Sequence, residues 1–237
     1  MASHFFKYSG DYAGFAAEEL ERRRPGATAL FVAGCGGDIN PSPMGRIELV
    51  SAHGKALADA VERVLELREG LHPLRAPLAV SFGEIEIPLD KAPPRELLEK
   101  LLDHQSPEQK RHAREMLKQL EAGRLPASVP YPILVWRLGP DLTLVALSGE
   151  VCVGYALRLN RELGPERVWV AGYANEVPCY IPSDRVLPEG GYEAGWGREL
   201  GRAVASGSIL VYGWPVPFAP GLEDRIVSSV QGLVRTP

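Results

Sequence analysis

Hydrophobic and polar residues follow two different periods along this chain, and together they predict both helices and strands. Apolar residues at helical spacing predict helices at 9–24, 46–68, 151–163 and 222–234. Short apolar or alternating runs predict strands at 27–34, 75–90, 131–138, 142–147, 168–173 and 209–212. Because strands alternate with helices, we expect an α/β fold with a layered sheet flanked by helices. The turn Gly139-Pro140-Asp141 joins two of the strands as a hairpin, so the sheet should be mixed.

The most polar part of the chain is the segment 94–122, which we interpret as a helical hairpin inserted over the main body. Ser106 followed by Pro107 is a good helix start, since proline suits the first helical position. This segment is the only one that looks separable. We therefore expect residues 1–237 to form a single α/β domain.

Composition narrows the class of protein. The chain has 237 residues, of which 45% are apolar and 24% charged, which is too apolar for a disordered chain. A net charge of −4 excludes a nucleic-acid binder that works by neutralising phosphates. No apolar run approaches the roughly 18 residues of a membrane span, and the N-terminus lacks a signal-peptide pattern. The residues favour a cytoplasmic protein, unless an upstream signal peptide directs it to the periplasm or the outside.

Three cysteines without CxxC spacing argue for a reducing compartment and against a disulfide scaffold or a cysteine-bound zinc. The five histidines include no pair at metal-ligand spacing, and His4 stands alone near the start. The motifs HExxH, GxSxG and the P-loop are absent from the sequence. By itself the sequence therefore supplies neither a complete zinc site nor a serine triad.

Three loops follow predicted strands, at the edge where open α/β sheets place their ligands. In the first loop, Gly36 and Gly37 let the backbone approach a ligand, and Asp38 and Asn40 supply oxygens. The alternative is an Asx-type turn in which Asp38 caps local amides, and these residues alone favour it.

The second loop places Glu150 between a strand and a helix, as a metal ligand, a general base, or a charge that stabilises the helix by about 0.3–1 kcal/mol. The third loop, 172–193, is long and contains polar and phenolic groups, a composition that is commonly functional. Those groups are Asn175, Glu176, Tyr180, Tyr192 and Glu193. The alternative for the tyrosines is local packing with a locally satisfied hydroxyl.

Five motifs occur in a fixed order along the chain and carry a family resemblance. They are Ser9-Gly-Asp-Tyr-Ala-Gly-Phe-Ala, Gly34-Cys-Gly-Gly-Asp-Ile-Asn-Pro, Ser148-Gly-Glu, Tyr173-Ala-Asn-Glu-Val-Pro-Cys-Tyr-Ile-Pro and Gly190-Gly-Tyr-Glu. Together they resemble the C-terminal half of the catalytic domain of the neutral/alkaline ceramidases, which are zinc-dependent amidases. The resemblance is closest to the short bacterial ceramidase-like proteins.

The resemblance implies a zinc site and a substrate. In the family, zinc is held by two histidines, a glutamate and a tyrosine, and the last two fall on Glu150 and Tyr180. The two histidines are expected from an upstream half of the domain that precedes this chain. Tyr192 matches a tyrosine near the substrate's polar head, and Gly37 is expected to bind the substrate as well. The expected ligand is a small-molecule or lipid-like amide.

One position departs from the family. Ceramidases have an essential serine where this chain has Asn40, so we expect an amide or ester other than ceramide, cleaved by a zinc-bound water. Asn40 would donate a hydrogen bond to the oxyanion, with Asp38 beside it in the catalytic loop. The alternative is a non-catalytic half-domain that binds a ligand or a polypeptide in the same cleft. We also expect self-association through an edge formed by the strands 27–34 and 142–147.

Overall fold

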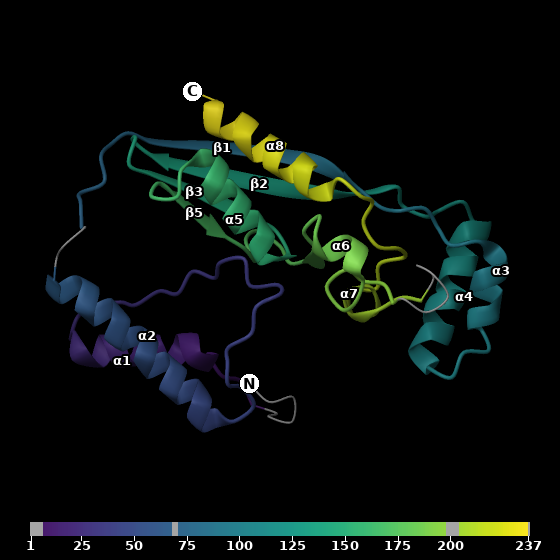
Figure 1. Ribbon diagram of the computed structural model, residues 1–237, viewed down its shortest axis with the longest axis horizontal. Coiled ribbons are helices and arrows are strands. Elements are labelled where there is room, and N and C mark those ends of the chain that lie inside the picture. Colours follow the sequence, from purple (N-terminus) through teal and green to yellow (C-terminus); the bar gives the residue numbers. More distant parts are fainter. Residues whose placement is uncertain (1–6, 68–70, 198–203, 237) are drawn as a thin grey trace. The chain divides into compact units, whose positions relative to one another are not determined.

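The computed structural model describes residues 7–67, 71–197 and 204–236. The chain combines helices with a mixed sheet of four strands on which helices pack, which confirms the predicted α/β fold (Figure 1). The chain divides into two compact units, which are described separately. The first unit extends up to Ala33 and from Asn40 to Pro73, and the second unit contains Gly34–Ile39 and everything from Leu74 onward.

The first unit is built on two helices, α1 (Asp11–Arg23) and α2 (Ile47–Leu67), both close to the predicted ranges. They approach closely at Gly54, where a Cβ would lie 2.5 Å from the Cβ of Phe15. Ion pairs of 2.7 Å join Arg23 to Asp59 and Arg24 to Glu62 across the pair. Close backbone approach and these pairs hold α1 against α2.

The predicted strand at 27–34 is wrong. The segment follows α1 without pairing to any described strand, and Leu30, Phe31 and Val32 are exposed. An apolar run indicates residues suited to burial, but a strand also needs a neighbouring backbone to accept its hydrogen bonds.

The second unit contains the main sheet, with strand order β1-β2-β3-β5. The strands are β1 (Leu78–Pro88), β2 (Ser128–Leu138), β3 (Leu142–Leu147) and β5 (Val168–Ala171). The first three pair antiparallel and β5 pairs parallel to β3. The hairpin at Gly139-Pro140-Asp141 is thus confirmed, and its antiparallel pairing together with the parallel strand β5 makes the sheet mixed.

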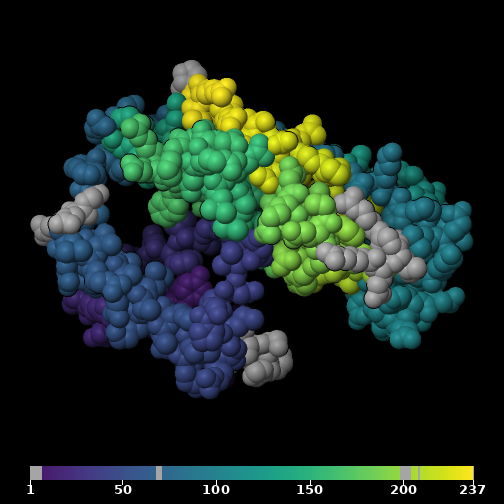
Figure 2. All heavy atoms as spheres, in the orientation of Figure 1, coloured from purple at the N-terminus to yellow at the C-terminus, as the bar shows by residue number. Residues whose placement is uncertain are grey.

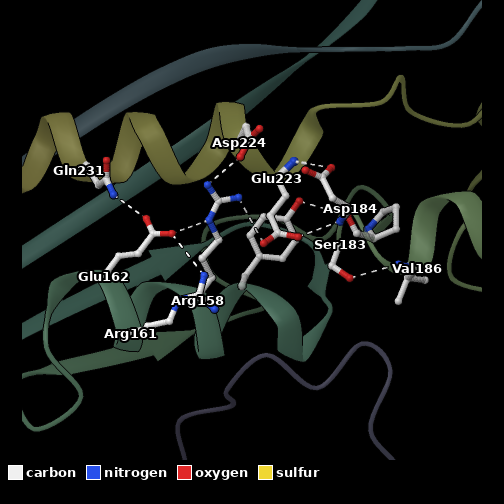
Figure 3. A network of polar contacts seen from close by, with 11 residues as sticks. Arg158, Arg161, Glu162, Ser183, Asp184, Val186, Glu223, Asp224 and Gln231 are labelled. Atoms are coloured by element: carbon white, nitrogen blue, oxygen red, sulfur yellow. Dashed lines mark hydrogen bonds and ion pairs between the residues drawn. The ribbon is translucent and has the colours of Figure 1, made fainter.

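Two helices, α5 (Val153–Leu163) and α8 (Leu222–Arg235), cover one face of this sheet (Figure 1). The core lies between them and the strands and is built from buried apolar residues, including Ile133, Val135, Leu147, Tyr155, Leu159, Ile226 and Val230. A polar network around Arg158 links α5 to α8 above this core (Figure 3).

The polar segment forms the predicted helical hairpin of α3 (Arg95–Leu101) and α4 (Pro107–Glu121). Ser106 caps α4, because its hydroxyl oxygen accepts a hydrogen bond from the Gln109 amide at 3.3 Å. Leu98 and Leu101 of α3 and Met116 of α4 are fully buried. The atoms of the hairpin form the teal part of the surface in Figure 2.

Four short elements complete the second unit. They are β4 (Glu150–Val151), β6 (Tyr180–Ile181), α6 (Val186–Glu189) and α7 (Gly207–Tyr212). The predicted strand at 209–212 is therefore wrong, since these residues lie in α7. Four consecutive apolar residues cannot distinguish a strand from a helix, and Gly213 ends α7 in the left-handed region with its amide donating to the Ile209 carbonyl.

Candidate functional site

Glu150 follows a turn whose backbone only glycine permits at position 149. Gly149 has φ +81°, and a Cβ on it would lie 2.7 Å from the Ile181 side chain and 2.8 Å from the Cys179 carbonyl oxygen. The next amide, that of Glu150, donates to that same carbonyl at 2.9 Å. Parallel pairing of β4 with β6 then sets Glu150 directly opposite Tyr180.

Two tyrosine hydroxyls hydrogen-bond the Glu150 carboxylate, and a third tyrosine, Tyr180, lies opposite Glu150 in the strand register. Tyr212 donates to Oε1, and Tyr173 donates to Oε2 at 3.5 Å. Burial, together with the negative charge of Glu150, raises the pKa of Tyr173 to about 12 and raises the pKa values of Tyr180 and Tyr212 as well. At neutral pH all three phenols are therefore protonated donors.

Tyr192 completes what we call the tyrosine cluster, the four residues Tyr173, Tyr180, Tyr192 and Tyr212. Its ring stands edge-on to Tyr180, with centroids 5.4 Å apart, and Tyr180 contacts Tyr212 at 6.2 Å. The ring of Tyr192 lies against Gly207, where a Cβ would come within 2.1 Å of it. Tyr192 remains 48% exposed, so it presents an aromatic surface to solvent beside Glu150.

The loop that contains Gly36 and Gly37 packs against β4 and Tyr173. The Gly37 amide donates to the Val151 carbonyl at 2.9 Å, and a Cβ on Gly37 would lie 2.4 Å from the Glu150 carbonyl oxygen. A Cβ on Gly36 would lie 3.5 Å from the Tyr173 hydroxyl. The structure thus brings parts of all three predicted loops together within the second unit. The absence of a side chain on Gly37 lets β4 pack against this loop, and the Gly37 amide already donates its hydrogen bond to β4.

Asp38 accepts a hydrogen bond at 2.6 Å from the amide of Val153, the first residue of α5. Its other carboxylate oxygen lies 3.9 Å from Arg185. The Asp38 carboxylate therefore caps a helix that starts far along the sequence. The turn alternative predicted that Asp38 caps backbone amides, but it placed those amides nearby in the sequence. Asn40 is exposed and belongs to the first unit, so its predicted catalytic role stays a prediction.

Sequence reasoning missed two residues that contact Glu150, namely Tyr173 and Tyr212. Tyr212 was assigned to a strand, although Ser206 before it and Gly213 after it are typical start and stop signals of a helix. Tyr173 has φ +56°, which is rare for a side chain of this size, and nearby Asn175 has φ +63°. Tyr173 adopts this left-handed conformation in the turn after β5, and no local residue pattern predicts it.

Nucleophilic cysteine chemistry does not suit this protein. Cys35, Cys152 and Cys179 are all buried and unpaired. Burial raises the pKa of each thiol to about 12, so none is a thiolate at neutral pH.

The donors around Glu150 fit zinc only in part. Among residues 7–67, 71–197 and 204–236, no group of three or more histidine, cysteine or acidic side chains could hold a metal ion. His53 bonds the Pro43 carbonyl at 2.8 Å, and His4 lies outside the described residues. The hard oxygens of Glu150 and Tyr180 suit two positions on zinc, whereas a catalytic zinc commonly has three protein ligands.

The chain was compared with known proteins, and neither a protein-family model nor a curated protein matches it. The ceramidase resemblance therefore remains a hypothesis based on the motifs. Within the described residues, no helix combines the length and the apolar character needed to cross a membrane.

Proposed function

We propose that this protein is a zinc-dependent hydrolase of the ceramidase-like type, acting on an amide (N-acyl) or ester bond. The observation that carries the proposal is the register of β4 and β6, which sets Glu150 opposite Tyr180 with further hydroxyls on the same carboxylate. Glu150 and Tyr180 would hold the metal, together with two histidines from outside the described residues.

Zinc bound there would lower the pKa of a bound water and polarise the carbonyl of the substrate. The chain's own residues would prepare the site. Tyr173 and Tyr212 fix the direction of the Glu150 carboxylate through their hydrogen bonds, as residues behind a metal ligand commonly do. The half-exposed ring of Tyr192 would pack against the substrate next to Tyr180.

The second candidate is a non-catalytic half-domain that binds a ligand or a polypeptide at the same site. It is favoured by the fact that both Glu150 oxygens already accept hydrogen bonds from tyrosines. In that case the tyrosine cluster is a rigid aromatic platform, and Glu150 is its internal acceptor.

Titration calorimetry with Zn²⁺ on the purified chain tests the proposal, using Glu150→Gln and Tyr180→Phe. With only two protein ligands we expect weak binding by the parent, weakened at least tenfold more in each variant. Glu84→Gln is the matched control, because Glu84 is an exposed carboxylate on β1 in the same unit.

Equal zinc affinity in parent and variants would remove Glu150 and Tyr180 from the metal site. A tight stoichiometric site in this chain would mean that other ligands exist, and His4 would be replaced first. Hydrolysis of fluorogenic N-acyl amides and esters, measured with and without zinc, separates the two candidates. Ligand binding by the parent without turnover under any metal condition would favour the non-catalytic half-domain.

A further inference from the structure

A cavity of about 450 Å³ lies between α4 and α7, in the second unit. Its α4 wall is formed by side chains spaced three or four positions apart, which share one side of the helix. Its α7 wall is formed by Ile209 and Leu210, and Gly213 follows at the end of α7, where an added Cβ would meet nothing within 4 Å. Ligand pockets commonly measure about 300–1,000 Å³, so this cavity has room for a small organic molecule.

Three cations of the α4 wall lack an ionic partner among the described residues. Arg111, Arg114 and Lys118 are exposed, and none of them forms an ion pair with the described part of the chain. His112 is the fourth basic residue of this wall. Burial lowers its pKa, so the His112 ring is uncharged at neutral pH. The positive charge of the wall therefore comes from two guanidinium groups and one ammonium group.

Two carboxylates, Glu108 and Glu115, belong to the same wall, but each already accepts a hydrogen bond. The Ser106 hydroxyl donates to Glu108 at 2.6 Å, and this bond lowers the pKa of the Glu108 carboxyl. The Gln119 side-chain amide donates to Glu115 at 3.0 Å. Three cations against two carboxylates leave one net positive charge on the cavity, in a chain whose net charge is −4. The wall therefore favours an anion.

We propose that this cavity binds a small phosphate monoester, with its phosphate among the cations of α4 and its organic group against α7. A phosphate carries a charge of about −1.5 to −2 at pH 7 and offers three acceptor oxygens. The planar guanidinium groups of Arg111 and Arg114 suit these oxygens through parallel pairs of hydrogen bonds, and Lys118 adds a point charge. A carboxylate brings only one charge and two oxygens to the same three groups.

The α7 wall argues for an organic phosphate rather than phosphate alone, because a phosphate fills only a small part of the cavity. Ile209 is buried and Leu210 is partly buried, so both offer an apolar surface that is held in place by the fold. Each CH₂ group that a ligand buries there should strengthen binding about fourfold. None of the cavity residues belongs to the tyrosine cluster, so this binding does not rest on the proposed zinc site.

Titration calorimetry with n-butyl phosphate, inorganic phosphate and butyrate tests the proposal. The buffer is neutral and low in salt, because salt screens exposed charges, and it contains EDTA, so that zinc cannot bind the phosphate. We expect n-butyl phosphate to bind at least tenfold more tightly than inorganic phosphate, since only the ester reaches α7. It should also bind at least tenfold more tightly than butyrate, which carries a single charge.

Variants of both walls locate the binding. Arg111→Gln with Lys118→Gln should weaken n-butyl phosphate binding at least tenfold, because two charge-assisted contacts are lost. The matched control is Lys100→Gln with Arg124→Gln, which removes the same charge from exposed positions outside the cavity and should bind like the parent. Leu210→Ala should weaken n-butyl phosphate about threefold or more and leave inorganic phosphate unchanged. Circular dichroism checks that each variant keeps its fold.

Three outcomes would overturn the proposal. The first is no binding of n-butyl phosphate by the parent up to about 10 mM. The second is an equal loss of affinity in the cation variant and its matched control, since the anion would then respond to overall charge rather than to the cavity. The third is a folded Leu210→Ala variant with unchanged affinity for n-butyl phosphate, because the organic group would then lie elsewhere.

Discussion

At the scale of single residues, glycines and backbone acceptors decide where the functional side chains lie. Gly149 and Gly37 allow the Glu150 strand to approach its neighbours, because a Cβ at either position would collide with backbone. Tyr131 then fixes the residue before this turn, since its buried hydroxyl donates to the Ser148 carbonyl at 2.8 Å. The backbone of Glu150 is thus placed by contacts of its neighbours, and Tyr173 and Tyr212 then orient its carboxylate.

Asp38 gives a prediction at this scale. Asp38→Ala should lower the free energy of unfolding by about 1 kcal/mol, because the Val153 amide at the start of α5 loses its cap. Asp38→Asn keeps an oxygen acceptor and should recover most of that loss in urea unfolding. If the Asn and Ala variants were equally unstable, the ion pair with Arg185 would be the important contact and the cap would not.

At the scale of elements, a polar network fastens α5 to α8 and to the turn before α6 (Figure 3). Arg158 of α5 donates to Glu162 at 2.8 Å and lies 2.6 Å from Asp224 and 3.4 Å from Glu223 on α8. Glu223 is nearly buried and also accepts from the Asp184 amide at 2.8 Å. One guanidinium therefore contacts three carboxylates from two helices and ties α5 to α8.

We predict that Arg158→Ala lowers the free energy of unfolding by about 1–3 kcal/mol, because Glu223 is left buried without its cationic partner. Arg161→Ala is the matched control on the same helix, since Arg161 is exposed and contacts Glu162 only at 3.5 Å. It should change stability little, as exposed ion pairs do. Equal losses in the two variants by thermal unfolding would show that helix propensity, rather than the network, is responsible.

At the scale of the whole molecule, the buried phenols set the response to alkali. Tyr131 and Tyr155 are fully buried in the core of the second unit, and desolvation raises the pKa of each well above its ordinary value of about 10. The hydroxyl of Tyr155 donates to the Pro182 carbonyl at 3.1 Å, so it is held as a neutral donor.

The folded protein keeps these protons at pH values where the unfolded chain loses them. The stabilisation is therefore complete below pH about 10, and the free energy of unfolding should fall as the pH rises above that value. Urea unfolding at a series of alkaline pH values measures the slope, and Tyr155→Phe should reduce it. A slope unaffected by removing this hydroxyl would contradict the assignment of the effect to buried tyrosines.

The local pattern of the sequence determined most of the elements of this molecule. Helices α1, α2, α5 and α8, the hairpin of α3 and α4, and strands β1, β2, β3 and β5 all follow from periodicity and from local start and stop signals such as Ser106-Pro107. These elements are predictable because the residues that decide each of them lie within a few positions of one another.

The tertiary structure decided what depends on contacts between distant residues. Whether 27–34 pairs as a strand, and whether 209–212 coils as a helix, depends on neighbouring backbone that a short apolar run does not specify. The sequence drew attention to Glu150, Tyr180 and Tyr192, but the approach of Tyr173 and Tyr212 to one carboxylate required the pairing of β4 with β6 and the left-handed backbone of Tyr173. Hydrophobic periodicity records how each residue meets its immediate neighbours, whereas a site or an interface is set by segments that fold together from far apart in the chain.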